Sequence, residues 1–192
     1  MELSYTEGQT FKNANYIEKP LVKGEYENCI FNQCDFSNSD LSSNRFFECS
    51  FIFCNLSMAK LTKSVLGGVK FKDCKLLGLR FDVCNEFGLQ LDFDNCILNL
   101  ASFYKTNLKK TIFRNSQLQE VDFTECDLSA ALFDGCDLMR ATFDNTVLEK
   151  ADFRTAVNYS IDPTKNRIRK AKFSLTGIVG LLDKYDIEVR TL

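Results

Sequence analysis

The chain has 192 residues, 45% of them hydrophobic and 26% charged, and a formal net charge of −2. This length fits one domain, and the weak negative charge argues against a general nucleic-acid binder, which needs clustered Lys and Arg. Because the chain has no His, it excludes Ser–His–Asp triads and His-ligated zinc, so we expect no enzyme, no metal and no cofactor. No apolar run is long enough for a membrane span, and nine cysteines, an odd number, favour reduced thiols in the cytoplasm.

Residues 1–8 precede a long repeat and are predicted to form an N-terminal cap. Early in the repeat, Lys19 occupies a slot that faces inward elsewhere, and Pro20 follows it. Because a cation is not buried without a partner, we expect the first coil to be open-ended or covered by residues 1–8.

A five-residue repeat extends over residues 9–155. Large apolar residues occupy every fifth position from Phe11 to Phe81 and then, two residues out of phase, from Phe93 to Phe153. The position two before each centre is mostly small, and we interpret its cysteines as small buried residues, because zinc ligands are usually spaced more tightly. All nine cysteines occupy this position: Cys29, Cys34, Cys49, Cys54, Cys74, Cys84, Cys96, Cys126 and Cys136.

A period of five matches neither a helix nor a flat strand. We therefore predict short extended pieces separated by turns of roughly a right angle, so that four pieces close a square coil of twenty residues. Phenylalanine recurs at positions 11, 31, 51 and 71, which supports a coil of this length. The fifteen centres before the phase change and the thirteen after it give about seven coils, stacked at the ~4.8 Å spacing of strands.

The pentads resemble those of the pentapeptide-repeat proteins, which read small residue, Asp or Asn, Leu or Phe, polar residue, any residue. Residues 34–38, 126–130 and 151–155 read CDFSN, CDLSA and ADFRT, and match this pattern directly. The resemblance implies an all-β fold, the right-handed quadrilateral β-helix of that family.

A two-residue insertion interrupts the repeat, because Phe81 and Phe93 are twelve positions apart where ten are expected. Glu86 falls where a core residue is expected, so the chain must bulge outward near residues 84–90. A tolerated surface insertion is one interpretation. A partner-contact site is the other, since related proteins carry functional loops between coils; its candidate residues are Asn85, Glu86, Phe87, Gly88, Leu89 and Gln90.

Acidic residues outnumber basic ones by nine to two over residues 115–152. Charges on neighbouring coils add up to a field, so these acids form a candidate partner-binding surface, with solvated scatter as the alternative. Residues 60–80 carry the opposite bias, six bases and one acid. The candidate acids are Glu120, Asp122, Glu125, Asp127, Asp134, Asp137, Asp144, Glu149 and Asp152.

Residues 156–192 are predicted to form a capping or dimerisation tail. From Ser174, apolar residues at helical spacing predict a short α-helix, although Gly177 and Gly180 weaken it. This helix either covers the open end of the last coil or joins two copies of the chain. The candidate dimerisation residues are Leu175, Ile178, Val179, Leu182 and Tyr185.

The run IDPTKNRI at residues 161–168 resembles the tail of McbG-like pentapeptide-repeat proteins. Together with the Qnr- and MfpA-like members, this subset implies a non-enzymatic homodimer that mimics DNA in width and charge. Such a dimer binds DNA gyrase or topoisomerase IV and protects it from a quinolone or a peptide toxin, with no direct contact to nucleic acid. The alternative is a pentapeptide-repeat scaffold for another protein, bound through the bulge or a flat side.

Overall fold

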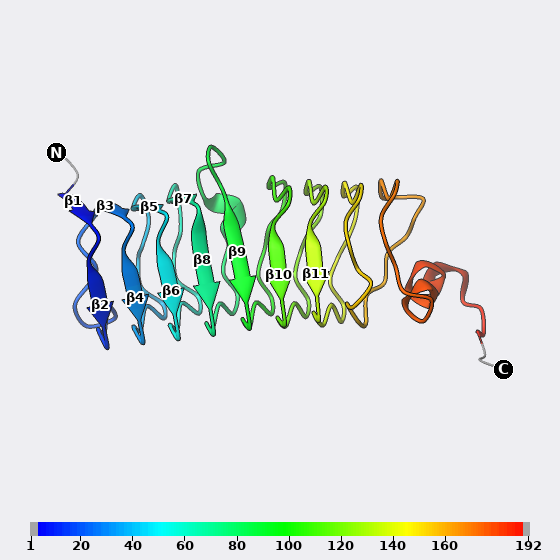
Figure 1. Ribbon diagram of the computed structural model, residues 1–192, viewed down its shortest axis with the longest axis horizontal. Coiled ribbons are helices and arrows are strands. Elements are labelled where there is room, and N and C mark those ends of the chain that lie inside the picture. Colours follow the sequence, from blue (N-terminus) through cyan, green and yellow to red (C-terminus); the bar gives the residue numbers. More distant parts are fainter. Residues whose placement is uncertain (1–3, 190–192) are drawn as a thin grey trace.

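The computed structural model describes residues 4–189, which form an all-β solenoid of about seven turns along one long axis (Figure 1). Within these residues no helix is long and apolar enough to cross a membrane. The three 3-10 helices are η1 (Phe81–Val83), η2 (Gly177–Leu181) and η3 (Asp183–Tyr185). The strands are β1 (Ser4–Glu7), β2 (Thr10–Lys12), β3 (Gly24–Glu27), β4 (Ile30–Asn32), β5 (Arg45–Phe47), β6 (Ser50–Ile52), β7 (Val65–Gly67), β8 (Val69–Lys72), β9 (Leu91–Asp94), β10 (Ile112–Arg114) and β11 (Leu132–Asp134).

All strand pairs are parallel, and their register follows the coil length. One side of the solenoid holds the sheet β1-β3-β5-β7, and another holds β11-β10-β9-β8-β6-β4-β2. Phe11 pairs with Phe31, twenty residues on, whereas Phe71 pairs with Phe93 across the insertion. The predicted all-β pentapeptide-repeat β-helix is thereby confirmed.

The polar positions of each pentad build the corners of the coil. Asp127 Oδ1 accepts a hydrogen bond of 3.0 Å from the backbone N–H of Ser129, and Asp35 does the same for Ser37 at 2.9 Å. The corner residue that follows has a left-handed backbone even where it is not Gly, as at Ala130 with φ of 58°. This conformation is unfavourable for a side chain, and it is held by hydrogen bonds such as Ala130 N–H to the carbonyl of Glu149, 2.8 Å.

The core is a set of stacked side chains, one per side of each coil. Phe113 and Phe133 stack with centroids 5.0 Å apart and planes 4° from parallel, which matches the spacing of paired strands. The nine cysteines are free, and Cys84 is the one that is only partly buried. Cys136 shows the common arrangement, in which the Sγ–H donates to a carbonyl of the preceding coil, that of Phe113, at 3.3 Å.

Pairing continues beyond residue 155 at the C-terminal end. Asp152 forms a parallel β-bridge with Lys172, and the rings of Phe173 and Phe153 stack with their centroids 5.5 Å apart. The inward slot of this last coil holds Asn166, whose Oδ1 accepts from the N–H of Thr146 at 2.9 Å. At the other end, β1 pairs with β3 as part of the solenoid, and Lys19 is exposed.

The tail differs from the predicted α-helix, because it consists of the two short 3-10 helices η2 and η3. Two glycines explain the difference. A Cβ atom on Gly180 would overlap the carbonyl oxygen of Tyr159, and one on Gly177 would overlap the hydroxyl of the same tyrosine. The backbone of η2 therefore lies directly against Tyr159, and the Gly180 carbonyl accepts from Ile161 N–H at 2.9 Å.

Candidate functional site

The insertion forms a loop that projects from the rod between η1 and β9 (Figure 1). The base of the loop is fixed on the preceding coil: Asn85 N–H donates to the carbonyl of Ser64 at 2.8 Å, and Gln90 N–H donates to that of Leu66 at 2.9 Å. Leu89 returns to the core and is only 9% exposed. Residues 86–88 are therefore the segment displaced outward.

Phe87 lies at the outer part of this loop and is 79% exposed. Its backbone N–H donates to Asn85 Oδ1 at 2.9 Å, and Gly88, with φ of 81°, turns the chain back toward the core. A large aromatic side chain is thus held in solvent by a turn with its own hydrogen bond. Glu86, which sequence spacing placed at a core position, is exposed as well.

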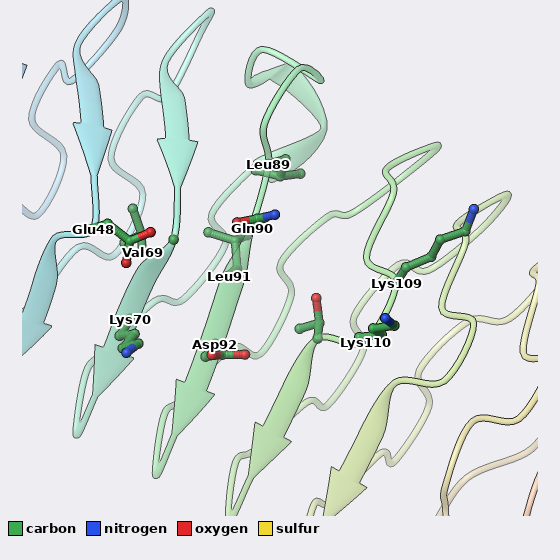
Figure 2. Close-up of a pocket in the computed structure, with 11 residues that line it drawn as sticks. Glu48, Val69, Lys70, Leu89, Gln90, Leu91, Asp92, Lys109 and Lys110 are labelled. Atoms are coloured by element: carbon green, nitrogen blue, oxygen red, sulfur yellow. The ribbon is translucent and has the colours of Figure 1, made fainter.

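A cavity of about 360 Å³ lies on one flank of the loop base (Figure 2). Leu89, Gln90 and Leu91 line it on one side, and residues 109–111 of the next coil line it on the other. Glu48, Lys70, Asp92 and Lys110 bring both signs of charge to its rim.

A second cavity, of about 390 Å³, lies on the other flank beneath Phe87. Leu89 lines both cavities, and Tyr104 stands at the far wall of this one. Lys105 lies 4.9 Å from the centre of the Tyr104 ring and 3.4 Å from Glu125. The loop side thus combines two hollows with two partly or largely exposed aromatic rings.

The nine candidate acids lie on all four sides of the rod. Asp122, Asp127, Asp137 and Asp152 belong to four separate ladders of bridges. Each side of the square coil therefore carries its own share of the acids, and the structure does not bring them into one patch.

Six of the nine acids form ion pairs, mostly with bases one coil away. Asp127 lies 3.2 Å from Lys109, for example, and Asp152 contacts Arg154 and Lys172 at 2.7 and 3.5 Å. The hydrogen bonds from Arg154 hold the pKa of Asp152 below its usual value. The full set of paired acids is Glu120, Glu125, Asp127, Asp134, Glu149 and Asp152.

The three remaining acids have other surroundings. Asp137 accepts from the side-chain amides of Gln119 and Asn158 at 2.7 and 2.8 Å. Asp122 accepts from the backbone of Thr124, and Asp144 has no ion pair among residues 4–189. Counting charges along the sequence missed this neutralisation, although the twenty-residue period could have predicted it by comparing each acid with positions one coil away.

The tail residues predicted to dimerise are largely at the surface. Leu175 is 89% exposed, and Ile178, Val179 and Tyr185 are exposed too, whereas Leu182 is half-buried. Lys184 Nζ binds Asp162 and Thr164 at 2.7 and 2.8 Å, which holds the tail on the last coil. One face of the tail therefore covers the end of the core, and the other presents apolar side chains to solvent.

Residues 4–189 contain no group of three or more His, Cys, Asp and Glu side chains placed to hold a metal ion. The thiols of Cys49 and Cys136 are poorly suited to act as nucleophiles, since burial raises the pKa of each to about 12. On the loop side, the described residues present contact surface in two cavities and in the rings of Phe87 and Tyr104.

Comparison with known proteins agrees with the geometry of the coils. Residues 89–160 match the family profile described as pentapeptide repeat region, and no curated protein matches the chain. Among solved structures, QnrB1, a plasmid-mediated fluoroquinolone resistance protein, aligns at 16% identity and a TM-score of 0.49 over 96% of this chain and 100% of its own. HetL, a heterocyst differentiation protein of Nostoc, aligns at 16% identity and a TM-score of 0.46 over 92% and 90%. The profile match covers residues 89–160, and coils of the same geometry continue on both sides of it.

Proposed function

We propose that this protein acts without catalysis, by binding a protein partner through the loop at residues 84–90. The observation that carries this proposal is Phe87, a largely exposed ring on a loop anchored at both ends. Leaving a Phe side chain in water forgoes about 2 kcal/mol of burial, and aromatic residues dominate the binding energy of protein interfaces. A partner that covers Phe87 would recover that energy.

The partner we infer is a type II DNA topoisomerase, DNA gyrase or topoisomerase IV, which the protein would protect from a quinolone or a peptide toxin. The inference comes from the resemblance of the pentads and of residues 161–168 to the Qnr-, MfpA- and McbG-like proteins. We also infer a location in the cytoplasm, where the free thiols would stay reduced.

The ion pairs argue against mimicry of DNA by the acidic set. Six of its nine carboxylates are ion-paired, and paired surface charges produce little field at a distance. We therefore expect the loop to contribute more to binding than the acids do.

We also propose that two copies join through the tail. Leu175, Ile178, Val179 and Tyr185 form its exposed apolar side, and a second tail would remove them from water. Light scattering should then give a dimer for the native chain and a monomer for Ile178→Asp. An unchanged mass would leave the tail with a capping role alone.

The main experiment measures DNA supercoiling by gyrase and DNA decatenation by topoisomerase IV in the presence of a quinolone, with purified protein added over a range of concentrations. We expect protection by the native chain and its loss in Phe87→Ser. Deleting residues 87 and 88, which removes the insertion, should have the same effect. The matched control is Glu120→Gln with Asp144→Asn, which leaves the loop intact and should protect as the native chain does.

Two results would contradict the proposal. If the native chain protects neither gyrase nor topoisomerase IV, the inferred partner is wrong. If the loop variants protect fully and the carboxylate variant does not, the acidic surface makes the contact instead.

A scaffold for a different protein is the second candidate function. The observation that favours it is the same neutralisation of the acids, because a charge-balanced rod is not specialised for a site that binds DNA. Under this alternative, Phe87→Ser would still disrupt binding of the true partner while gyrase stays unaffected by every form of the chain.

A further inference from the structure

The loop side of the rod, defined by the ladder of Asn107, Asp127, Val147 and Arg167, contains an interrupted row of hydrogen bonds. At the equivalent position of other coils, the backbone N–H donates to a carbonyl of the preceding coil. The distances are 2.9 Å from Val65 to Asn44, 3.0 Å from Asp127 to Thr106, 2.9 Å from Val147 to Cys126 and 3.0 Å from Arg167 to Thr146. The N–H of Asn107 has no such acceptor in the part of the chain that the structure describes.

Two carbonyls beside it are also unpaired. Leu108 N–H donates to the carbonyl of Asp127 at 2.8 Å, yet among residues 4–189 no N–H of the loop coil donates to the carbonyl of Asn107. The same holds for Lys109, although its counterpart Ser129 accepts from Lys110 at 3.0 Å. One N–H and two carbonyls therefore follow one another along a single exposed edge.

The cause is the insertion. Asn85 and Gln90 bond to the coil before them, and the chain between them leaves the rod, so within the described residues no backbone N–H of residues 85–90 bonds to the coil after them. A solenoid normally pairs every internal strand edge. Here, an unpaired edge lies in the middle of the rod.

The unpaired edge lies in the two cavities beside the loop. Asn107 lines the cavity beneath Phe87, and Lys109 lines the one shown in Figure 2. Leu89 separates the two, and Phe87 and Tyr104 offer apolar surface at the first. The edge can therefore be reached from solvent, next to exposed aromatic rings.

We propose that this edge binds an extended peptide segment of the partner, which pairs its backbone with Asn107 and Lys109 and places an apolar side chain against Phe87 and Tyr104. Strand addition of this kind takes affinity from backbone hydrogen bonds and specificity from alternate side chains. The proposal specifies how the partner in the proposed function is held, and it rests on that function only for the identity of the partner.

The test selects random twelve-residue peptides displayed on phage on the whole native protein, and then measures how tightly each selected peptide binds the native chain, Asn107→Pro and Asn107→Ala. Pro removes an N–H that has no acceptor within the described residues, so the coil loses no backbone hydrogen bond. Asn107→Ala is the matched control. Both variants lose the hydrogen bond that the backbone N–H of Lys109 donates to Asn107 Oδ1, and only Asn107→Pro also loses the backbone N–H of residue 107. We expect selected peptides to bind Asn107→Pro about tenfold more weakly and Asn107→Ala within about threefold of the native chain.

A second measurement does not depend on the variant's folding. Methylating the backbone nitrogens of a selected peptide one at a time should weaken binding at alternate positions, because neighbouring residues of a strand point their N–H groups in opposite directions. Peptides that bind Asn107→Pro as well as the native chain, or a methylation profile without alternation, would overturn the proposal. Neither measurement uses a topoisomerase, so the edge and the proposed partner can fail separately.

Discussion

Replacing Gly180 with Ala should destabilise the tail, although Ala is the better helix former. In an α-helix, Gly to Ala gains about 1 kcal/mol. In η2, the new methyl group would overlap the backbone carbonyl of Tyr159, and backbone, unlike the end of a flexible side chain, cannot turn aside. An α-helical tail and the 3-10 helix η2 therefore predict opposite changes in the stability of the tail for Gly180→Ala.

The size of the effect follows from what must move. Either η2 lifts away from the last coil, or Tyr159 shifts within a core in which it is 5% exposed. Overpacking of this kind costs about 1–3 kcal/mol, and lifting would also weaken the 2.9 Å bond from Ile161 N–H to the Gly180 carbonyl. Because each coil contacts only its neighbours, the loss should be confined to the C-terminal end.

Hydrogen exchange is the assay, since it resolves local opening. Amides at Ile161 and along η2 should exchange faster in Gly180→Ala, while those of β3 to β6 should stay unchanged. Gly177→Ala is the matched comparison, because its methyl would overlap the hydroxyl of Tyr159. Adding Tyr159→Phe should rescue Gly177→Ala and leave Gly180→Ala unrescued. Slower exchange in Gly180→Ala would refute the packing argument.

Three further predictions concern the end of the rod and its core. Asn166→Ala should lower the free energy of unfolding by about 2–4 kcal/mol, measured by urea denaturation, because it leaves the buried Thr146 N–H and Phe143 carbonyl unpaired; a loss below about 0.5 kcal/mol would contradict this. Hydrogen bonds from Lys184 and Thr164 hold the pKa of Asp162 well below its usual value. The ionised carboxylate should therefore hold the tail at pH values above the ordinary Asp pKa near 3.9, and the tail should loosen as the pH falls below that value. Amide hydrogen exchange measured between pH 6 and pH 3 should show this loosening of the tail in the native chain and not in Asp162→Asn. In the folded protein, the eight buried thiols should resist an aromatic disulfide reagent that titrates all nine in urea, and rapid reaction of Cys54 or Cys74 would show that the core is open.

Most of the fold is predictable because the pentad is a local rule with a global result. The apolar residue at every fifth position sets the inward direction, and Asp or Asn before it supplies the acceptor that turns the corner, as Asp127 does for Ser129. The Phe residues then stack by register, as Phe113 does on Phe133. Each pentad repeats the same pattern, so a single residue that departs from it, such as Lys19 at an inward position, has little effect on the fold of the solenoid.

The tail was less predictable, because its conformation depends on a residue outside it. The apolar residues of the tail have helical spacing, at Leu175, Ile178, Val179 and Leu182. Nothing nearby in the sequence indicates that Tyr159 lies in close contact with Gly177 and Gly180. The pair of glycines three residues apart was the available signal. Helix propensity alone assigns this pair to a weak helix, whereas it marks a close approach of two backbone segments.

The unpaired edge at Asn107 could not be predicted from the same rule, because it arises from what the insertion removes. Two extra residues were enough to predict a bulge, and the pentads after it keep the regular pattern, with Asn107 and Leu108 in their expected positions. Some of the backbone hydrogen bonds of a coil, however, are made with the coil before it. Once residues 86–88 leave the rod, the N–H and carbonyl of Asn107 and the carbonyl of Lys109 lack partners in the coil before them, while their own sequence is unchanged. A regular solenoid can therefore acquire a binding edge without altering the residues that form it, and the place to search for one is the coil that follows an insertion.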